Sequence, residues 1–237
     1  MNNFQKPTEI NIQNDKNALA REVSRRLRAL YPDAVCALKY GGEPWRLLIM
    51  AILSAQCTDA RVNLVSEELF RRYPTIESVA ACDIVGLEDS VRSCGLYKTK
   101  AKNIRASCAI ICEKYGGELP HDMDVLLSLP GVGRKIANLL RGDIFGLGGI
   151  VADTHCIRLC SRLGFTKPGE RDPLRTEKAL SALISGDEQS DFCHRFVLFG
   201  RETCTARSPK CAGCPLYDVC AGREYVGGAS APPNPRH

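Results

Sequence analysis

No apolar run in this 237-residue chain approaches the ~20 consecutive residues that a membrane-spanning helix needs, so we expect no membrane segment. The first residues, Met1 to Lys16, are polar and lack the apolar core of a signal peptide. We therefore expect a cytoplasmic protein whose thiols stay reduced. Its thirteen cysteines then predict metal binding or packing rather than disulfides.

The sequence also lacks any convincing period-two alternation of apolar and polar residues, the pattern of a half-buried β-strand, and it has no internal repeat. Apolar residues recur instead at helical spacing, so the predicted fold class is all-α. Pro44 opens an apolar segment from Trp45 to Leu53, which predicts a central buried helix. Several cysteines have apolar neighbours and are expected to be small buried residues: Cys36, Cys82, Cys94, Cys108, Cys112 and Cys160.

Four cysteines near the C-terminus follow the spacing C-x6-C-x2-C-x5-C: Cys204, Cys211, Cys214 and Cys220. Thiolates this close in sequence are typical ligands of a metal centre, either an iron–sulfur cluster or a structural Cys₄ zinc site. Zinc ribbons usually show two short C-x2-C pairs, and this chain has one. The loop between the first two cysteines carries Arg207 and Lys210, which we expect to bind DNA phosphates.

Upstream lies a glycine hairpin, Leu129-Pro130-Gly131-Val132-Gly133-Arg134-Lys135, between two predicted helices. Glycine permits positive φ and a close approach of the backbone to a ligand. The N–H groups at the start of the second helix suit a phosphate, so residues Gly131 to Arg134 are predicted to contact a DNA backbone. The formal net charge of +5 permits such a polyanion. The alternative is an ordinary helix–turn–helix connection.

Lys135 is placed at the start of the second helix, where the helix dipole disfavours a cation. This placement and partial burial would favour the neutral amine, a nucleophile that forms a Schiff base with a sugar aldehyde. The alternative is a solvated surface lysine. Asp153 precedes another helix, where its carboxylate can stabilise positive charge on a sugar or assist proton transfer. It can equally be a plain N-cap, and the two roles are compatible.

Taken together, the motifs resemble the endonuclease III family of helix–hairpin–helix base-excision DNA glycosylases. The resemblance runs from Leu19 to Ala221 and departs from the family at Cys57, where members often have Ala. A second departure is Gly142, which predicts that the helix after the hairpin ends early or kinks. The matching segments are Leu53 to Asp59, Gly95-Leu96-Tyr97, the hairpin, Val151 to His155 and the four cysteines.

The resemblance implies catalytic roles for Lys135 and Asp153, and a [4Fe–4S] cluster bound by the four cysteines. It places Gln56 and Leu96 where the family inserts side chains into the DNA gap left by the extruded nucleotide. On other readings, Gln56 is a plain loop amide and Leu96 a contact at a helix end. The implied fold has two helical domains with a DNA groove between them. Their expected limits are 37–147 for a six-helix barrel, 14–36 with 148–224 for the cluster domain, and 1–13 and 225–237 for disordered tails.

The implied activity is bifunctional. A damaged base, expected to be an oxidised pyrimidine, is removed from duplex DNA, and the abasic site is cleaved on its 3′ side by β-elimination through a lysine Schiff base. The expected partner is double-stranded DNA with a damaged base or abasic site, bound by a monomer that is nucleoid-associated if bacterial. The alternatives are a monofunctional adenine or mismatch glycosylase, a non-catalytic DNA-binding iron–sulfur protein, and an electron-transfer protein.

Overall fold

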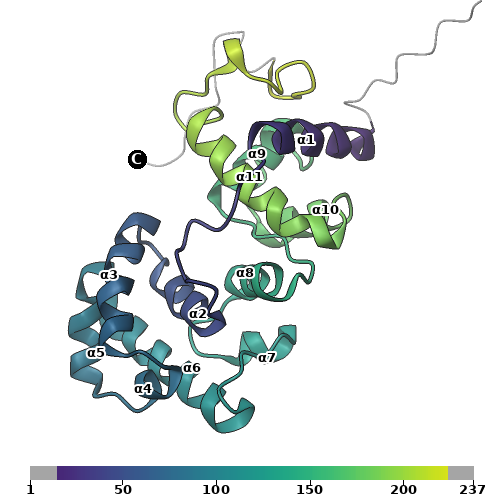
Figure 1. The fold of residues 1–237 in the computed structure, drawn as a ribbon. Helices are drawn as coiled ribbons and strands as arrows, with labels where there is room; N and C mark the ends of the chain where they lie inside the picture. Colours follow the sequence, from purple (N-terminus) through teal and green to yellow (C-terminus); the bar gives the residue numbers. More distant parts are fainter. Residues whose placement is uncertain (1–14, 224–237) are drawn as a thin grey trace, which may run out of the picture. The chain divides into compact units, whose positions relative to one another are not determined.

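The computed structural model describes residues 15–223, and within them all regular structure is helical (Figure 1). The all-α prediction is confirmed, and no helix in this part is long and apolar enough to cross a membrane. The expected disordered tails lie outside the described residues. The elements are α1 (Lys16–Leu30), α2 (Pro44–Leu53), α3 (Asp59–Arg72), α4 (Ile76–Ala80), α5 (Ile84–Val91), η1 (Arg92–Cys94), α6 (Tyr97–Tyr115), α7 (Met123–Ser128), α8 (Arg134–Phe145), α9 (Thr154–Leu163), α10 (Pro173–Ser181), η2 (Gly186–Glu188), α11 (Gln189–Glu202) and η3 (Cys211–Gly213).

The helices form two compact units. One is continuous in sequence, Val35–Val151, and holds α2 to α8. The other combines residues 15–34 with residues 152–223, and so joins α1 to α9, α10 and α11. For the continuous unit, the sequence analysis had predicted limits of 37 and 147.

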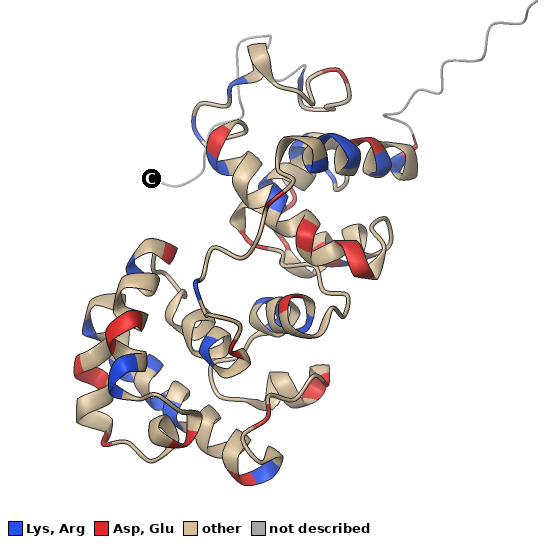
Figure 2. Ribbon diagram, viewed as in Figure 1, with Lys and Arg blue, Asp and Glu red and all other residues tan. Residues whose placement is uncertain are grey.

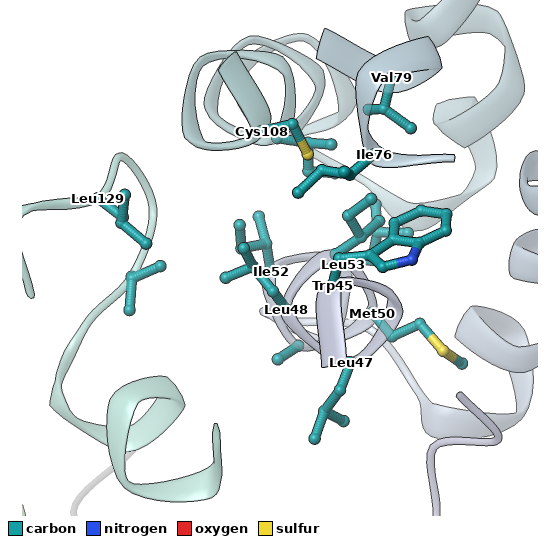
Figure 3. Packing of buried hydrophobic residues seen from close by; sticks show 14 of the residues in the cluster. Trp45, Leu47, Leu48, Met50, Ile52, Leu53, Ile76, Val79, Cys108 and Leu129 are labelled. Carbon is teal, nitrogen blue, oxygen red and sulfur yellow. The ribbon is translucent and has the colours of Figure 1, made fainter. Parts of the chain in front are cut away.

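The core of the continuous unit is built around α2. Every residue from Leu47 to Leu53 is buried, and so is Trp45, because this helix is covered by α3, α6 and α8 (Figure 3). Full burial of one such apolar side chain contributes roughly 1.5–3 kcal/mol. The prediction of a central buried helix is confirmed.

Helix α8 does not end early at Gly142. It continues to Phe145 and ends at Gly146, which takes the left-handed conformation with φ of 62°. Glycine inside a helix costs roughly 1 kcal/mol relative to alanine. Burial of Ala137 and Leu140, on the helix that packs against α2, offsets this cost.

The second unit packs α1 and α9 against α11, and α10 against α9. Four phenylalanines fill its core: Phe165, Phe192, Phe196 and Phe199. Helix α1 buries the stripe Leu19, Ala20, Val23 and Leu27 and carries Lys and Arg along its other faces (Figure 2).

Six cysteines with apolar neighbours in the sequence were expected to be buried, and only three of them are. Cys94, Cys108 and Cys160 are buried, whereas Cys36, Cys82 and Cys112 are half-buried. The difference follows from position, since Cys36 and Cys82 lie in connections between helices, where packing is one-sided.

Candidate functional site

The glycine hairpin links α7 to α8 and is held against α6. Gly131 has a φ of +81°, and a Cβ there would lie 2.9 Å from Nδ2 of Asn103 on α6. The Ser107 hydroxyl, also on α6, donates a hydrogen bond of 2.8 Å to the Pro130 carbonyl. Glycine is therefore required at 131 for two reasons, and the turn has a fixed position on its unit.

Val132 belongs to the core of the hairpin and not to its surface. Its side chain is 6% exposed, and its N–H donates to the Leu129 carbonyl at 3.1 Å. Both groups are engaged within the turn, so Val132 anchors the hairpin, and the DNA contact expected for it stays a prediction. The exposed residues of the hairpin are Gly131, Gly133 and Arg134.

Lys135 follows in the first turn of α8 and is exposed. The partial burial expected for it is wrong. The reason is geometric, because Leu129 and Val132 bury the turn on one side and leave the start of α8 facing solvent. Gly133, the N-cap residue, has no side chain to cover this helix end.

Asp153 is the N-cap of α9, as one of its two predicted roles requires. Its Oδ1 accepts a hydrogen bond of 2.7 Å from the N–H of Cys156, and the residue is half-buried. This bond fixes the orientation of the carboxylate at the positive end of a helix. The neighbouring His155 is packed: its Nδ1 lies 3.1 Å from Arg158 Nη2, and burial lowers its pKa.

Gln56 and Leu96 share an unusual backbone. Among the described residues they are the non-glycine residues with positive φ, at 54° and 46°. Both are exposed, and the Leu96 side chain is 61% accessible although it is a large apolar group. Gln56 lies in the loop after α2, and Leu96 directly after Gly95 at the end of η1. A left-handed Leu is strained, so the surrounding structure must hold it in place.

The four cysteines lie on residues 204–220, which we call the cysteine segment. Two arginines of α9 bind it. Arg162 Nη1 lies 3.2 Å from Sγ of Cys204 and donates to the Thr205 carbonyl at 2.7 Å, and its Nη2 donates to the Ala206 carbonyl at 3.0 Å. Arg158 donates to the Cys204 carbonyl at 3.1 Å. These bonds from α9 fix the loop that carries Arg207 and Lys210, and both of these side chains are exposed.

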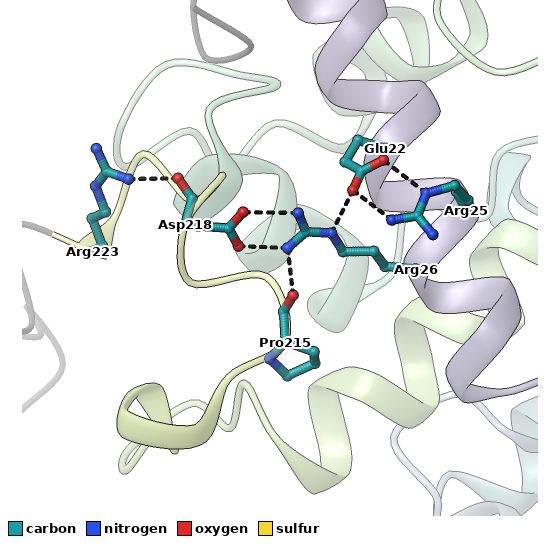
Figure 4. Close-up of polar contacts among 6 residues, drawn as sticks. All are labelled: Glu22, Arg25, Arg26, Pro215, Asp218 and Arg223. Carbon is teal, nitrogen blue, oxygen red and sulfur yellow. Dashed lines mark hydrogen bonds and ion pairs between the residues drawn. The ribbon is translucent and has the colours of Figure 1, made fainter.

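Helix α1 holds the same segment from another side (Figure 4). Arg26 binds both carboxylate oxygens of Asp218, at 2.5 and 2.8 Å, and the Pro215 carbonyl at 2.7 Å. Glu22 orients this guanidinium, and hydrogen bonds from Arg25 and Arg26 lower the Glu22 pKa to about 2. The four cysteines therefore lie on a chain segment that two helices fix.

The four thiols lie near one another on the segment that α1 and α9 hold. Burial raises the pKa of Cys211, Cys214 and Cys220, to about 11 for Cys220, and the Cys204 charge adds to each pKa shift. Four cysteine thiolates are the donor set of a [4Fe–4S] cluster and also of a structural zinc site.

Comparison with known proteins agrees with these features. Residues 49–185 match the family model described as HhH-GPD superfamily base excision DNA repair protein, and residues 204–220 match the iron-sulfur binding domain of endonuclease III. The chain is 44% identical to endonuclease III of Synechocystis sp., over 86% of this chain and 93% of that one. It is 37% identical to endonuclease III of Escherichia coli, over 86% and 96%.

The chain belongs to the endonuclease III family. A solved endonuclease III–DNA complex superposes with a TM-score of 0.83 at 42% identity, covering 90% of this chain and 99% of that one. A thermostable thymine-DNA glycosylase, at 20% identity, shares the fold with a TM-score of 0.80. As a member of this family, the protein is a base-excision DNA glycosylase and AP lyase with a [4Fe–4S] cluster.

Some residues that build the endonuclease III site escaped the sequence reasoning. Lys100 is buried on α6 and bonds to the last carbonyls of α2 and η1, just before Gln56 and Leu96, and Arg162 holds the cysteine segment. Lys100 had a signal: it stands in the apolar stripe of its helix, four residues before Ile104, where a cation needs a partner. Arg162 had none, since its acceptors are backbone carbonyls far away in the sequence.

Proposed function

We propose that this enzyme removes oxidised pyrimidines from duplex DNA and cleaves the resulting abasic site, with Lys135 as nucleophile and Asp153 as its electrostatic partner. The observation that carries the proposal is the exposed Lys135 amine in the first turn of α8. It follows the hairpin directly, at a helix start that no side chain caps. Monofunctional members of the wider superfamily need no such amine. The lysine therefore favours lyase chemistry.

The target base must leave the duplex before it can react, and unstacking costs a few kcal/mol, less for a damaged base. Gln56 and Leu96 would enter the vacated space. Their exposed side chains and fixed left-handed backbones support this role, because a side chain that is already in place needs no reorganisation on binding.

In the reaction itself, Lys135 Nζ attacks C1′ of the sugar while the bond from C1′ to the base breaks. Asp153 stabilises the positive charge on the sugar, and the departing base takes up a proton. The C1′–O4′ bond of the sugar ring then breaks, O4′ takes up a proton, and an iminium forms between C1′ and Nζ. The iminium acidifies the C2′ proton, and its removal expels the 3′ phosphate by β-elimination.

DNA phosphates would be bound by the N–H groups around Gly131 and Gly133, by Arg134, and by Arg207 and Lys210 of the cysteine segment. We assign Cys204, Cys211, Cys214 and Cys220 as the cluster ligands. The cluster supplies a cross-link that keeps this segment folded. The enzyme would act as a monomer on damaged duplex DNA, in the cytoplasm and at the nucleoid if the source is bacterial.

Borohydride trapping tests the central claim. The substrate is a duplex with one thymine glycol, and the proteins are wild type, Lys135→Ala and Lys114→Ala, the last an exposed lysine at the far end of α6. We expect a covalent protein–DNA adduct with wild type and Lys114→Ala and none with Lys135→Ala. Base release by wild type without an adduct would show a monofunctional enzyme. A duplex with an abasic site separates a wrong lesion from absent lyase activity.

A further inference from the structure

Lys100 on α6 is a buried cation that bonds to two backbone carbonyls, one of them 47 residues away in the sequence. Its side chain lies in the interior of the continuous unit, with the residue only 4% exposed. Nζ donates to the Leu53 carbonyl at 2.8 Å and to the Cys94 carbonyl at 2.7 Å. Burial lowers its pKa, and the groups that raise it are the thiols of Cys57 and Cys94.

The two carbonyl groups that accept from Lys100 belong to the last residues of two helices. Leu53 is the last residue of α2, and Cys94 is the last residue of η1. Carbonyls at these ends lack partners within their helices, and a cation there is favoured by the helix dipole. One ammonium group therefore serves as the C-terminal cap of two separate elements.

Each of the two capped carbonyls lies a few residues before a residue with a left-handed backbone. Gln56 follows Leu53 by three residues, and Leu96 follows Cys94 by two. The loops are far apart in sequence, and the ammonium of Lys100 joins their starting points through a single nitrogen atom. Strained backbone of this kind persists only where the surroundings fix it.

We propose that Lys100 is a positioning residue for DNA insertion, which sets the spacing and backbone of the loops that carry Gln56 and Leu96. The inference rests on the insertion role proposed above for these two side chains. A lysine suits the task because its terminal nitrogen has three donors and reaches two carbonyls from different segments. A methionine fills similar space but donates to neither.

Kinetics can separate positioning from stability. The variants are Lys100→Met, Gln56→Ala/Leu96→Ala, the triple variant, and Lys114→Met as the control. Each is assayed on a thymine glycol duplex and on a single-stranded oligonucleotide with an abasic site, where no base needs to be extruded. We expect Lys100→Met to slow the duplex reaction by about tenfold to a hundredfold, as for misplaced groups in other enzymes, with little change on the single strand.

The triple variant gives the decisive comparison. If Lys100 acts through the two loops, Lys100→Met will slow the duplex reaction no further once Gln56 and Leu96 are already alanine. An additive loss, or an equal loss on both substrates, would overturn the inference and leave Lys100 with a purely structural role. Full duplex activity in Gln56→Ala/Leu96→Ala would overturn it too, because insertion would then be unnecessary.

Amide hydrogen exchange without DNA provides a readout independent of activity. Lys100→Met should raise exchange at residues 54–58 and 95–97 together and leave the other residues of α6 and α2 protected. Unchanged exchange in both loops would contradict the proposal. An inactive wild type would refute the proposed function, whereas an active wild type with unaltered loops in Lys100→Met would refute only this inference.

Discussion

At the scale of single residues, the hairpin depends on glycine at one of its two glycine positions far more than at the other. Gly131 has positive φ and lies against Asn103, whereas Gly133 has φ of −94° and open space where a Cβ would be. The two positions thus form a matched pair for testing what fixes the turn.

Gly131→Ala is expected to destabilise the protein by about 1–3 kcal/mol, from left-handed strain together with the clash with Asn103. Gly133→Ala should cost only about 0.5–1 kcal/mol, from its poorer N-cap, since its backbone is extended and its surroundings are empty. Urea unfolding of both variants beside wild type gives the comparison. Equal stabilities for the two variants would mean that Asn103 does not constrain the turn.

Asp153 has two roles that substitution can separate. Asn is as good an N-cap as Asp, so Asp153→Asn should keep the bond to Cys156 and the wild-type stability while removing the charge. Asp153→Ala should also lose about 1 kcal/mol of stability with the cap. Base release by both variants should fall at least about a hundredfold, the usual effect of losing an electrostatic group. Normal base release by Asp153→Asn would leave Asp153 as a cap alone.

The residue scale also shows where sequence reasoning stops. The Asp153 cap could be predicted because it depends on residues within three positions. The left-handed backbones of Gln56 and Leu96 could not, because a non-glycine residue with positive φ is stabilised by contacts such as that of Lys100 with the Leu53 carbonyl, 47 residues away. Exposure of Lys135 and burial of Val132 likewise depend on how the turn packs on α6.

At the scale of elements, apolar patterning predicted the all-α class and helix α2 and failed on weaker signals. The run from Trp45 to Leu53 identified α2 because every residue of the run except Arg46 is apolar. Helix α4 was missed, since its five residues are too few to show a period. Gly142 led to the prediction that the helix after the hairpin ends early or kinks. Helix α8 continues past it, because its packing outweighs the small local cost of a glycine inside a helix.

The link from α1 to the cysteine segment leads to a prediction about the cluster. Arg26→Ala removes three hydrogen bonds to Pro215 and Asp218. We expect cluster loss to a chelator, followed by its visible absorbance, to be severalfold faster than in wild type. Arg25→Ala is the matched control, because Arg25 is exposed and pairs only locally with Glu22. Equal rates for the two variants would show that α1 does not stabilise the cluster segment.

At the scale of the whole molecule, the cysteine segment and the α2 core belong to different units. Removing the cluster should therefore abolish amide protection in residues 204–223 and leave α2 and α6 protected. Hydrogen exchange before and after chelation measures this directly. A Cys57→Ala variant, which lacks one half-buried loop thiol, controls for side reactions and should behave the same way. Loss of protection in α2 would mean that the two units unfold together.

The bonds between Arg26 and Asp218 join residues that are 192 positions apart in the chain. During synthesis at roughly 5–20 residues per second, about 10–40 seconds separate the appearance of the two partners. The ribosome thus completes residues 35–151 while α1 still lacks the helix on which it packs. The apolar stripe of α1 is made first and covered last, so translation sets the earliest time at which the cluster-bearing unit can fold.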